Sequence, residues 1–295
     1  NELILAIALG IVQGITEFLP ISSTAHLRLI SEFLVQKDVG LTASNLIQFG
    51  TLLAIVQYFW PELKGLIIHI FKVSTSKKEF KEFWHNVGEW LRGKKNFQDA
   101  QEADQDTLIA QVIIATVPIV IFALLMRDQI EVLRENIFNI AYFLLFGGLL
   151  IAASELIHKR NKDTNKELIM RPWEVLLIGL FQCLAVFPGV SRSGATLAGA
   201  LFLGRERQSS VRFSFLLSIP ALSLAGLYDL VKIIRPLNQQ QTTFLPTADG
   251  WLNNNINLSV LAMLISFILA YIVGLICLRW LLKYLATNDS RIFII

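Results

Sequence analysis

Apolar residues in this chain fall in long continuous blocks rather than in the alternating or three-to-four spacing of soluble strands and helices. Four blocks reach about 20 residues, the length that a helix needs to cross the hydrocarbon core of a bilayer. They lie at about 42–60, 108–126, 138–157 and 257–282. A fifth block, at about 211–233, contains Pro220 and Gly226, breaks that neighbouring helices can accommodate. We therefore expect an all-α polytopic membrane protein with about five to six spanning helices.

Two further apolar regions are each interrupted by a short polar segment. In the first, an apolar arm at 3–19 is followed by PISSTAH and a shorter apolar stretch. In the second, an arm at 173–187 is followed by PGVSRSGAT and LAGALFLG. Irregular backbone at membrane depth persists only where protein buries it or where it lines a polar cavity. Because both breaks carry several hydroxyls, we expect two re-entrant hairpins; the alternative is plain helices joined by surface loops.

The two interrupted regions also form an internal repeat, because GIVQGITEFLPISST aligns without gaps over GLFQCLAVFPGVSRS. The identical pairs are Gly10 with Gly179, Gln13 with Gln182, Phe18 with Phe187 and Ser22 with Ser191. Repeats of opposite orientation place a binding site near the bilayer midplane. We expect one integral membrane domain at 1–295, with repeat one at about 1–157 and repeat two at about 172–295.

Basic residues distinguish the two sides of the expected membrane domain. Lys and Arg are concentrated in the loops at 61–107 and 158–171, and further arginines follow at 204–212. Since basic loops stay in the cytoplasm, the first hairpin enters from outside and the second from the cytoplasm, so that their polar tips meet within the membrane. The middle of the first loop, about 74–106, is expected to be a soluble helical excursion.

The composition agrees with a membrane protein and argues against several other classes. The chain has 295 residues, 54% hydrophobic and 17% charged, against about 25% charged residues in an ordinary soluble domain. Its net charge of +3 gives no reason to expect a nucleic-acid partner. Cys183 and Cys277 lie in apolar segments outside any CxxC pair, so we expect neither a disulfide framework nor a zinc site. Glu2 stands where a basic n-region would be, so no cleavable signal peptide is expected.

One ionisable residue lies inside the apolar arm of the first region. Glu17 would be costly at membrane depth without partners, and such a residue by default marks a functional site. The alternative is a Glu17 that is merely solvated at the interface. Gln13 lies one helical turn earlier on the same face, so both side chains point toward the polar break. We expect Glu17 to be catalytic and Gln13 to bind substrate.

A histidine closes the polar break of the first region. It follows the hydroxyl residues Ser22, Ser23 and Thr24. Beside hydroxyls, His26 can act as a general acid, a general base or a nucleophile near neutral pH. We expect Ser23 and His26 to be catalytic, and Ser22 and Thr24 to bind substrate.

The second break has the features of an anion-binding turn. Pro188 and Gly189 interrupt the arm, and backbone amides at the start of the next helix form a nest for an anion. Arg192 adds a permanent charge whose forked donors match phosphate oxygens; the alternative is pairing with lipid headgroups at the interface. Further phosphate donors are expected from Ser191, Ser193, Gly194 and Thr196.

Taken together, these parts indicate phosphoryl transfer. A phosphate needs a cationic clamp, here Arg192 with backbone amides, and an activated nucleophile, either Ser23 or His26. It also needs a carboxylate, Glu17, to hold a divalent cation or to orient the histidine. The apolar surroundings indicate that the phosphate is carried on a lipid.

At these residues the chain resembles the undecaprenyl-diphosphate phosphatases, the bacitracin-resistance family of bacteria. QGITEFLPISSTAH is similar to the family's (E/Q)xxxE followed by PxSSxxH, and PGVSRSGAT is similar to PGxSRSxxT. The resemblance extends over essentially the whole chain. It implies hydrolysis of undecaprenyl diphosphate to undecaprenyl phosphate and inorganic phosphate, which recycles the lipid carrier of cell-wall synthesis. It also implies Mg²⁺ or Ca²⁺, the inner membrane and a site open to the periplasm.

The resemblance also implies roles for individual residues. The acidic motif falls on Gln13 and Glu17, with Glu17 as the expected metal ligand, and the nucleophile or base candidates are Ser23 and His26. The phosphate clamp falls on Arg192, Ser191, Ser193 and Thr196. Many members carry Glu where this chain has Gln13, so Glu17 is the only carboxylate of the pair.

Three other features depart from the family pattern. Ala25 replaces a common Gly, and the insertion at about 74–106 is longer than is typical. The family also continues into another apolar helix beyond RIFII, so we expect this chain to lack a final span.

Two other functions fit part of the pattern. A lipid-phosphate transporter or flippase would use the same site for binding only, but it needs no nucleophile and base, whereas SSxxH beside Glu17 supplies both. An acid-phosphatase-like enzyme needs a His and an Asp after its SR motif, and 191–212 contains neither. Either Ser23 attacks with His26 as base or His26 attacks directly, and we favour Ser23. The partners expected are the polyprenyl diphosphate and membrane lipids, and a homodimer stays an open alternative.

Overall fold

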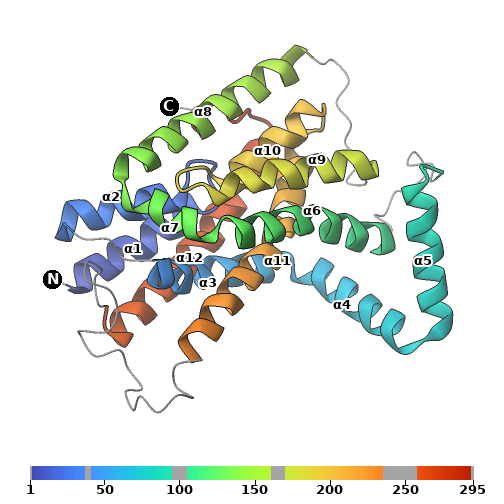
Figure 1. The fold of residues 1–295 in the computed structure, drawn as a ribbon, viewed down its shortest axis with the longest axis horizontal. Helices are drawn as coiled ribbons and strands as arrows, with labels where there is room; N and C mark the ends of the chain where they lie inside the picture. Colours follow the sequence, from blue (N-terminus) through green and yellow to red (C-terminus); the bar gives the residue numbers. More distant parts are fainter. Residues whose placement is uncertain (1, 37–40, 95–104, 161–169, 235–257, 294–295) are drawn as a thin grey trace.

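A computed structural model describes residues 2–36, 41–94, 105–160, 170–234 and 258–293, and Figure 1 shows that the elements in these ranges are helices. The first interrupted region forms α1 (Glu2–Thr16) and α2 (Ser23–Val35). The second forms α9 (Pro172–Cys183), the short 3-10 helix η2 (Leu184–Val186) and α10 (Arg192–Phe202). Both regions therefore consist of two helical arms around a polar break, as the sequence predicted.

The long apolar blocks form the remaining large helices. These are α3 (Leu41–Tyr58), α6 (Gln105–Leu125), α8 (Ile137–Arg160), α11 (Arg207–Ile234) and α12 (Val260–Leu285). Four of them, α6, α8, α11 and α12, are each long and apolar enough to cross a membrane. A fifth span is reached when α3 is taken together with α4 (Trp60–Thr75), which is bent from it by 82°. The expectation of an all-α polytopic membrane protein is confirmed.

The bend between α3 and α4 has a local cause. Pro61 lies in the first turn of α4, where its missing N–H costs nothing, whereas within a continuous helix its ring would clash with the preceding turn. The polar loop predicted to be an excursion begins with this bend. It continues as α4 and α5 (Lys77–Leu91).

The described part of the segment expected to be a soluble helical excursion is helical, and α5 is attached to the body of the protein. Trp90 is fully buried, and its indole N–H donates to the Met170 carbonyl at 2.8 Å. Asp106, at the start of α6, accepts from Asn86 at 2.7 Å and contacts His69 Nε2 at 2.5 Å. These contacts join α4, α5 and α6. Residues 95–104 of that prediction lie outside the described residues.

The two interrupted regions point toward each other. In Figure 1, α1 enters the bundle from the left and α9 from the right, and the breaks that follow them meet near the middle. Arg192 Nη2 lies 3.4 Å from Glu17 Oε1, which is a direct contact between the two breaks. The prediction of two opposed hairpins with adjoining tips is confirmed.

Each hairpin packs against a spanning helix of the other repeat. α1 lies along α12, and a Cβ added at Gly10 would stand 2.6 Å from the Ser266 carbonyl oxygen. α9 lies along α6, and a Cβ added at Gly179 would stand 2.8 Å from the Ala115 carbonyl oxygen. The aligned residues Gly10 and Gly179 therefore have the same structural role, because each allows close backbone contact between two helices. The two repeats are interlocked rather than side by side.

Ion pairs gather the predicted basic segments at one end of the molecule. Arg205 contacts Glu174 at the start of α9 at 2.5 Å, and Arg207 contacts the buried Glu155 near the end of α8 at 2.6 Å. Arg212 reaches Glu62 of α4 at 2.8 Å. The turn at 204–212 thus lies beside the ends of α8, α9 and the α3–α4 bend, as the placement of Lys and Arg required. The short α7 (Arg127–Glu135) connects α6 to α8, and η4 (Arg291–Phe293) follows α12.

Candidate active site

The Glu17 carboxylate lies at the centre of the contact between the hairpins, directly after α1. Its side chain is only 8% exposed. Four side chains donate to it: Gln13 at 3.0 Å, Ser23 at 2.8 Å, Gln48 at 2.9 and 3.0 Å, and Arg192 at 3.4 Å. A buried carboxylate without such donors would be strongly unfavourable. The donors come from α1, α2, α3 and α10, so the charge of Glu17 is stabilised only in the assembled fold.

The Ser23 hydroxyl is bound by the Glu17 carboxylate rather than by the histidine. Its Oγ donates to Glu17 Oε2 at 2.8 Å. His26 Nδ1 lies 2.8 Å from the Ser22 carbonyl oxygen, which can only accept, so Nδ1 carries a proton and Nε2 is the basic nitrogen. Within the described chain, no hydrogen bond joins Ser23 to His26. The group in place to take the Ser23 proton is therefore Glu17, whereas the sequence suggested His26.

A strained cap shapes the first tip. Ser22 has φ 67°, a left-handed conformation that is uncommon for a residue other than glycine. Its Oγ accepts from the Ala25 amide at 3.5 Å at the start of α2, while its carbonyl holds His26. Ser22 therefore orients the tip, and backbone strain of this kind often accompanies functional sites. Thr24 is partly exposed.

Arg192 has a buried donor left over for a ligand. Its side chain is 18% exposed, and Nη2 contacts Glu17. Nη1 is buried, and no partner for it exists among the residues that the structure describes. A buried guanidinium N–H without a partner is costly, and a phosphate oxygen would satisfy it. This geometry agrees with the predicted phosphate clamp.

The other predicted donors of the second tip mainly hold α10. Ser191 Oγ accepts from the Gly194 amide at 3.2 Å and lies 3.0 Å from Ser193 Oγ. Thr196 Oγ1 donates to the Arg192 carbonyl at 2.9 Å and lies 2.5 Å from Ser214 Oγ of α11. The structure therefore brings Arg192 to the Glu17 carboxylate, whereas the Ser191 and Thr196 hydroxyls are engaged elsewhere.

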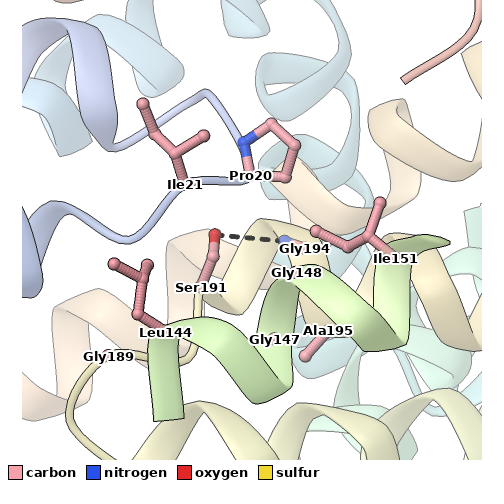
Figure 2. A pocket seen from close by; sticks show the side chains of 10 residues that line it. All are labelled: Pro20, Ile21, Leu144, Gly147, Gly148, Ile151, Gly189, Ser191, Gly194 and Ala195. Carbon is pink, nitrogen blue, oxygen red and sulfur yellow. Dashed lines mark hydrogen bonds between the residues drawn. The ribbon is translucent and has the colours of Figure 1, made fainter. Parts of the chain in front are cut away.

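Gly194 lies in tight packing where the two tips meet α8 (Figure 2). A Cβ added at Gly194 would stand 2.9 Å from Ile151 Cδ1 and 3.3 Å from Pro20 Cβ. Pro20 belongs to the first tip and Ile151 to α8. Gly194 therefore allows the hairpins to pack closely. Its backbone amide, expected to bind phosphate, donates to Ser191 Oγ.

Sequence reasoning missed Gln48, which donates to both oxygens of Glu17 from α3. It also missed Thr51, whose Oγ1 accepts from Gln13 at 3.4 Å. A signal was present: polar residues recur at helical spacing along the apolar block 42–60, namely Ser44, Asn45, Gln48 and Thr51. Such a polar face in a spanning helix indicates a functional cavity.

The candidate site offers a divalent cation one carboxylate, that of Glu17. The described residues contain no group of three or more His, Cys, Asp or Glu side chains placed to hold a metal ion. Mg²⁺ is commonly held by one or two carboxylates together with substrate phosphates and water. The donor set therefore fits a cation that the substrate helps to bind, with Glu17 as its protein ligand.

Comparisons with known proteins agree with the geometry. The family model described as bacitracin resistance protein BacA matches residues 6–295. An undecaprenyl-diphosphatase of Chlorobium phaeovibrioides is 37% identical over 294 residues, covering 98% of this chain and 91% of the relative. One from Corynebacterium glutamicum is 34% identical over 287 residues, covering 97% of this chain and 84% of the relative. The chain therefore belongs to the BacA bacitracin resistance family.

Proposed function

We propose that this chain hydrolyses undecaprenyl diphosphate to undecaprenyl phosphate and inorganic phosphate. The reaction returns the lipid carrier to cell-wall synthesis and confers resistance to bacitracin. One observation carries the proposal: Glu17 of one hairpin binds both Ser23, at 2.8 Å, and Arg192 of the opposite hairpin, at 3.4 Å. A nucleophile, its proton acceptor and a phosphate clamp thus meet in one buried place, as phosphoryl transfer requires.

In the mechanism that this geometry favours, Arg192 binds oxygens of the terminal phosphate and leaves the Glu17 carboxylate free to accept a proton. Ser23 Oγ attacks the terminal phosphorus as its proton passes to Glu17, and the bond from that phosphorus to the bridging oxygen breaks. Undecaprenyl phosphate departs with the electron pair of that bond. Water then attacks the phosphoserine, and inorganic phosphate leaves as Ser23 recovers its proton. His26 Nε2 is the base available for the water.

The alternative route begins with attack by His26 Nε2 and forms a phosphohistidine. The two routes leave different covalent intermediates, so rapid acid or alkaline quenching followed by peptide mapping separates them. A phosphoserine at position 23 supports the pairing of Ser23 with Glu17. An acid-labile phosphate on His26 would assign nucleophilic attack to the histidine.

The cation belongs to the same proposal. Glu17 would be the protein residue that holds Mg²⁺ or Ca²⁺, and the cation would supply positive charge to offset the negative charge of the diphosphate. Glu17→Gln should then abolish turnover and also lower the affinity for the metal, which can be measured by Mn²⁺ paramagnetic relaxation in the presence of substrate. Full activity after exhaustive chelation would remove the cation from the mechanism.

The orientation also belongs to the proposal: the protein lies in the bacterial inner membrane with its site open to the periplasm. The support is that Arg205, Arg207 and Arg212 lie together at one end of the molecule, because basic segments favour the cytoplasmic side of a membrane. Single cysteines at exposed positions of α5 should react with impermeant thiol reagents only after the membrane is opened. Labelling of α5 in intact cells would reverse the orientation.

The deciding experiment measures phosphate release from undecaprenyl diphosphate by the purified full chain with Mg²⁺. We expect release by the wild type and a loss of turnover with Glu17→Gln, Ser23→Ala or Arg192→Ala. Opposed hairpins also suit a transporter, so substrate binding should be measured in parallel. Binding without release by the wild type would replace the hydrolase with a carrier.

A further inference from the structure

α4 presents apolar side chains that the described part of the chain does not bury. No residue of α4 is buried, and Ile67, Ile70 and Phe71 are 55%, 49% and 68% exposed. The three positions share one face, because residues three or four apart are neighbours on a helix. An exposed apolar face of this kind marks an interaction surface.

α5 has two apolar stripes, and the body of the protein covers one of them. Val87 and Trp90 are buried in a core cluster together with Met170. Phe80 and Trp84 are 51% and 56% exposed, and their ring centroids lie 6.1 Å apart in an edge-to-face contact. The first stripe therefore attaches α5 to the bundle, whereas the second extends the exposed apolar face of α4.

Lysines surround the exposed apolar side chains of both helices. Residues 64–81 contain one acid, Glu79, and five exposed lysines: Lys64, Lys72, Lys77, Lys78 and Lys81. On α5 a lysine precedes each exposed ring by three residues, so that each ring has an ammonium group beside it. The next acid, Glu82, pairs with Lys78 at 3.7 Å. Apolar rings flanked by lysines are typical of a helix that lies on a membrane surface.

The direction of the two helices fits the same surface. α3 packs along the spanning helix α12, and α4 is bent from α3 by 82°. A helix at that angle to a spanning neighbour lies near the plane of the bilayer. In Figure 1, α5 stands at the right edge of the molecule and runs across the ends of α6 and α9.

Exposed tryptophans gather at this end of the molecule. Besides Trp84, the exposed ones in the described ranges are Trp60 at the α3–α4 bend, Trp173 at the start of α9 and Trp280 near the end of α12. The α3–α4 bend and the start of α9 lie beside the arginine turn at 204–212. The segment after α12 contacts the end of α8. Tryptophans concentrate at headgroup level in membrane proteins, so α5 lies at that level too.

We propose that this surface, made of Ile67, Ile70, Phe71, Phe80 and Trp84 with Lys72, Lys77 and Lys81, binds anionic phospholipid at the membrane interface. The apolar side chains enter the boundary between headgroups and acyl chains, and the ammonium groups contact headgroup phosphates. Each lysine near an anionic leaflet strengthens attachment about fivefold. The surface should therefore prefer anionic over zwitterionic lipid.

The competing occupant is a soluble acidic protein, which would also suit aromatic rings and lysines. Position favours lipid, because α4 leaves α3 at the membrane surface and the exposed tryptophans lie at headgroup level. A protein that binds from solution would have to displace headgroups already present there. The test must therefore measure lipid contact directly.

The test places the fluorophore bimane on single cysteines of the full chain, in phosphatidylcholine nanodiscs and in a background of Cys183→Ala with Cys277→Ala. Lipids with brominated chains quench a fluorophore that touches them. Glu82→Cys is the matched control for Trp84→Cys, because Glu82 lies on the opposite side of α5 and is also more than half exposed. We expect quenching about fivefold stronger at position 84. Equal quenching at both positions overturns lipid contact and leaves the surface to a soluble partner.

The preference for charge is measured in the same discs with brominated phosphatidylglycerol. At the Trp84→Cys label, we expect an apparent association constant about tenfold higher for phosphatidylglycerol than for phosphatidylcholine. Lys72→Gln with Lys77→Gln and Lys81→Gln should reduce this ratio to about twofold or less. The control is Arg92→Gln with Lys94→Gln, at the far end of α5, where both side chains contact one glutamate. It should leave the ratio nearly unchanged.

A third measurement needs no lysine variant. In about 1 M salt, where the screening length falls to about 3 Å, the preference for phosphatidylglycerol should largely disappear. An equal ratio in the wild type and the triple lysine variant, or a ratio that salt does not change, overturns recognition of anionic headgroups. These readouts do not involve phosphate release, so failure of the proposed hydrolase leaves them intact.

Discussion

The two hairpins share a scaffold but differ at the positions that matter for chemistry. In the alignment of the repeats, Ser22 and Ser191 both cap the second arm, and each accepts from the backbone amide three residues later. The next position is Ser23 in one hairpin and Arg192 in the other. The proposed nucleophile and the proposed clamp therefore occupy equivalent places, brought face to face by the opposed orientation of the repeats.

The first arms show the same division of roles. Glu17 aligns with Val186, so at this position only the first hairpin carries a charge. Gln13 donates to the Glu17 carboxylate, whereas its equivalent Gln182 donates to the Ala115 backbone carbonyl at 3.1 Å. The two hairpins therefore share a similar frame, and differences at single aligned positions make the site asymmetric. One tip carries the proposed nucleophile Ser23 and its proposed base Glu17, and the other carries the positively charged Arg192.

The largest effect on turnover should come from Ser23→Ala, which removes the Ser23 hydroxyl from the first tip. Loss of a nucleophile costs more than about 10⁴-fold in kcat in well-studied cases. Phosphate release from undecaprenyl diphosphate measures the effect, and Ser74→Ala, an exposed serine on α4, is the control for expression and folding. Turnover reduced less than tenfold would shift the nucleophile to His26.

Removal of the equivalent residue in the second tip should come next. Arg192→Ala deletes donors to the transferred phosphate, an effect of about 10²–10³-fold in kcat/KM. Arg192→Lys keeps the charge without the fork and should fall between the wild type and Arg192→Ala. Near-normal turnover of Arg192→Ala would remove this residue from the clamp and end the comparison between the tips.

Two glutamines, Gln48 and Gln182, should separate catalytic from structural roles more finely. Gln48→Leu removes two hydrogen bonds from the Glu17 carboxylate and should lower kcat about tenfold, because groups that orient a reactive residue contribute about 10–100-fold. Gln182→Leu, the same change at a fully buried glutamine of α9, should lower Tm while kcat stays within twofold. Equal losses of kcat in the two variants would contradict a positioning role for Gln48.

The shared scaffold predicts equal effects at the aligned glycines. Gly10→Ala and Gly179→Ala each place a methyl group under 3.0 Å from backbone carbonyl oxygen. Forced separation of packed helices costs about 1–3 kcal/mol, so both variants should lower Tm by similar amounts in detergent. A large drop for one variant only would show that the two interfaces are not equivalent.

The smallest effect should be that of Thr196→Val. Its hydroxyl contacts Ser214 and the Arg192 carbonyl, so KM for the substrate should change less than twofold. The unpartnered Ser214 hydroxyl should lower stability by about 1 kcal/mol or more, and Thr196→Val with Ser214→Ala should recover part of that loss in thermal unfolding. A tenfold rise in KM would restore Thr196 to the phosphate site that the sequence suggested.

Much of this protein is determined by the sequence alone. Long apolar blocks predict spanning helices because an unpaired backbone polar group is costly in hydrocarbon, and only helices satisfy it within one segment. Proline, glycine and hydroxyl clusters mark the breaks after α1 and η2 for the same reason. The placement of Lys and Arg indicates which ends lie together, and the ion pairs of Arg205 and Arg207 agree.

The tertiary structure decided how the parts of the site meet. Glu17 and Arg192 are 175 positions apart, and nothing local in the chain brings them to 3.4 Å. The same holds for Gln48, since a polar residue on a spanning helix acquires its partner only when α3 packs beside α1. The fold also assigned Ser23 to Glu17 and Thr196 to Ser214, because a short hydroxyl bonds to whichever partner packing brings within reach.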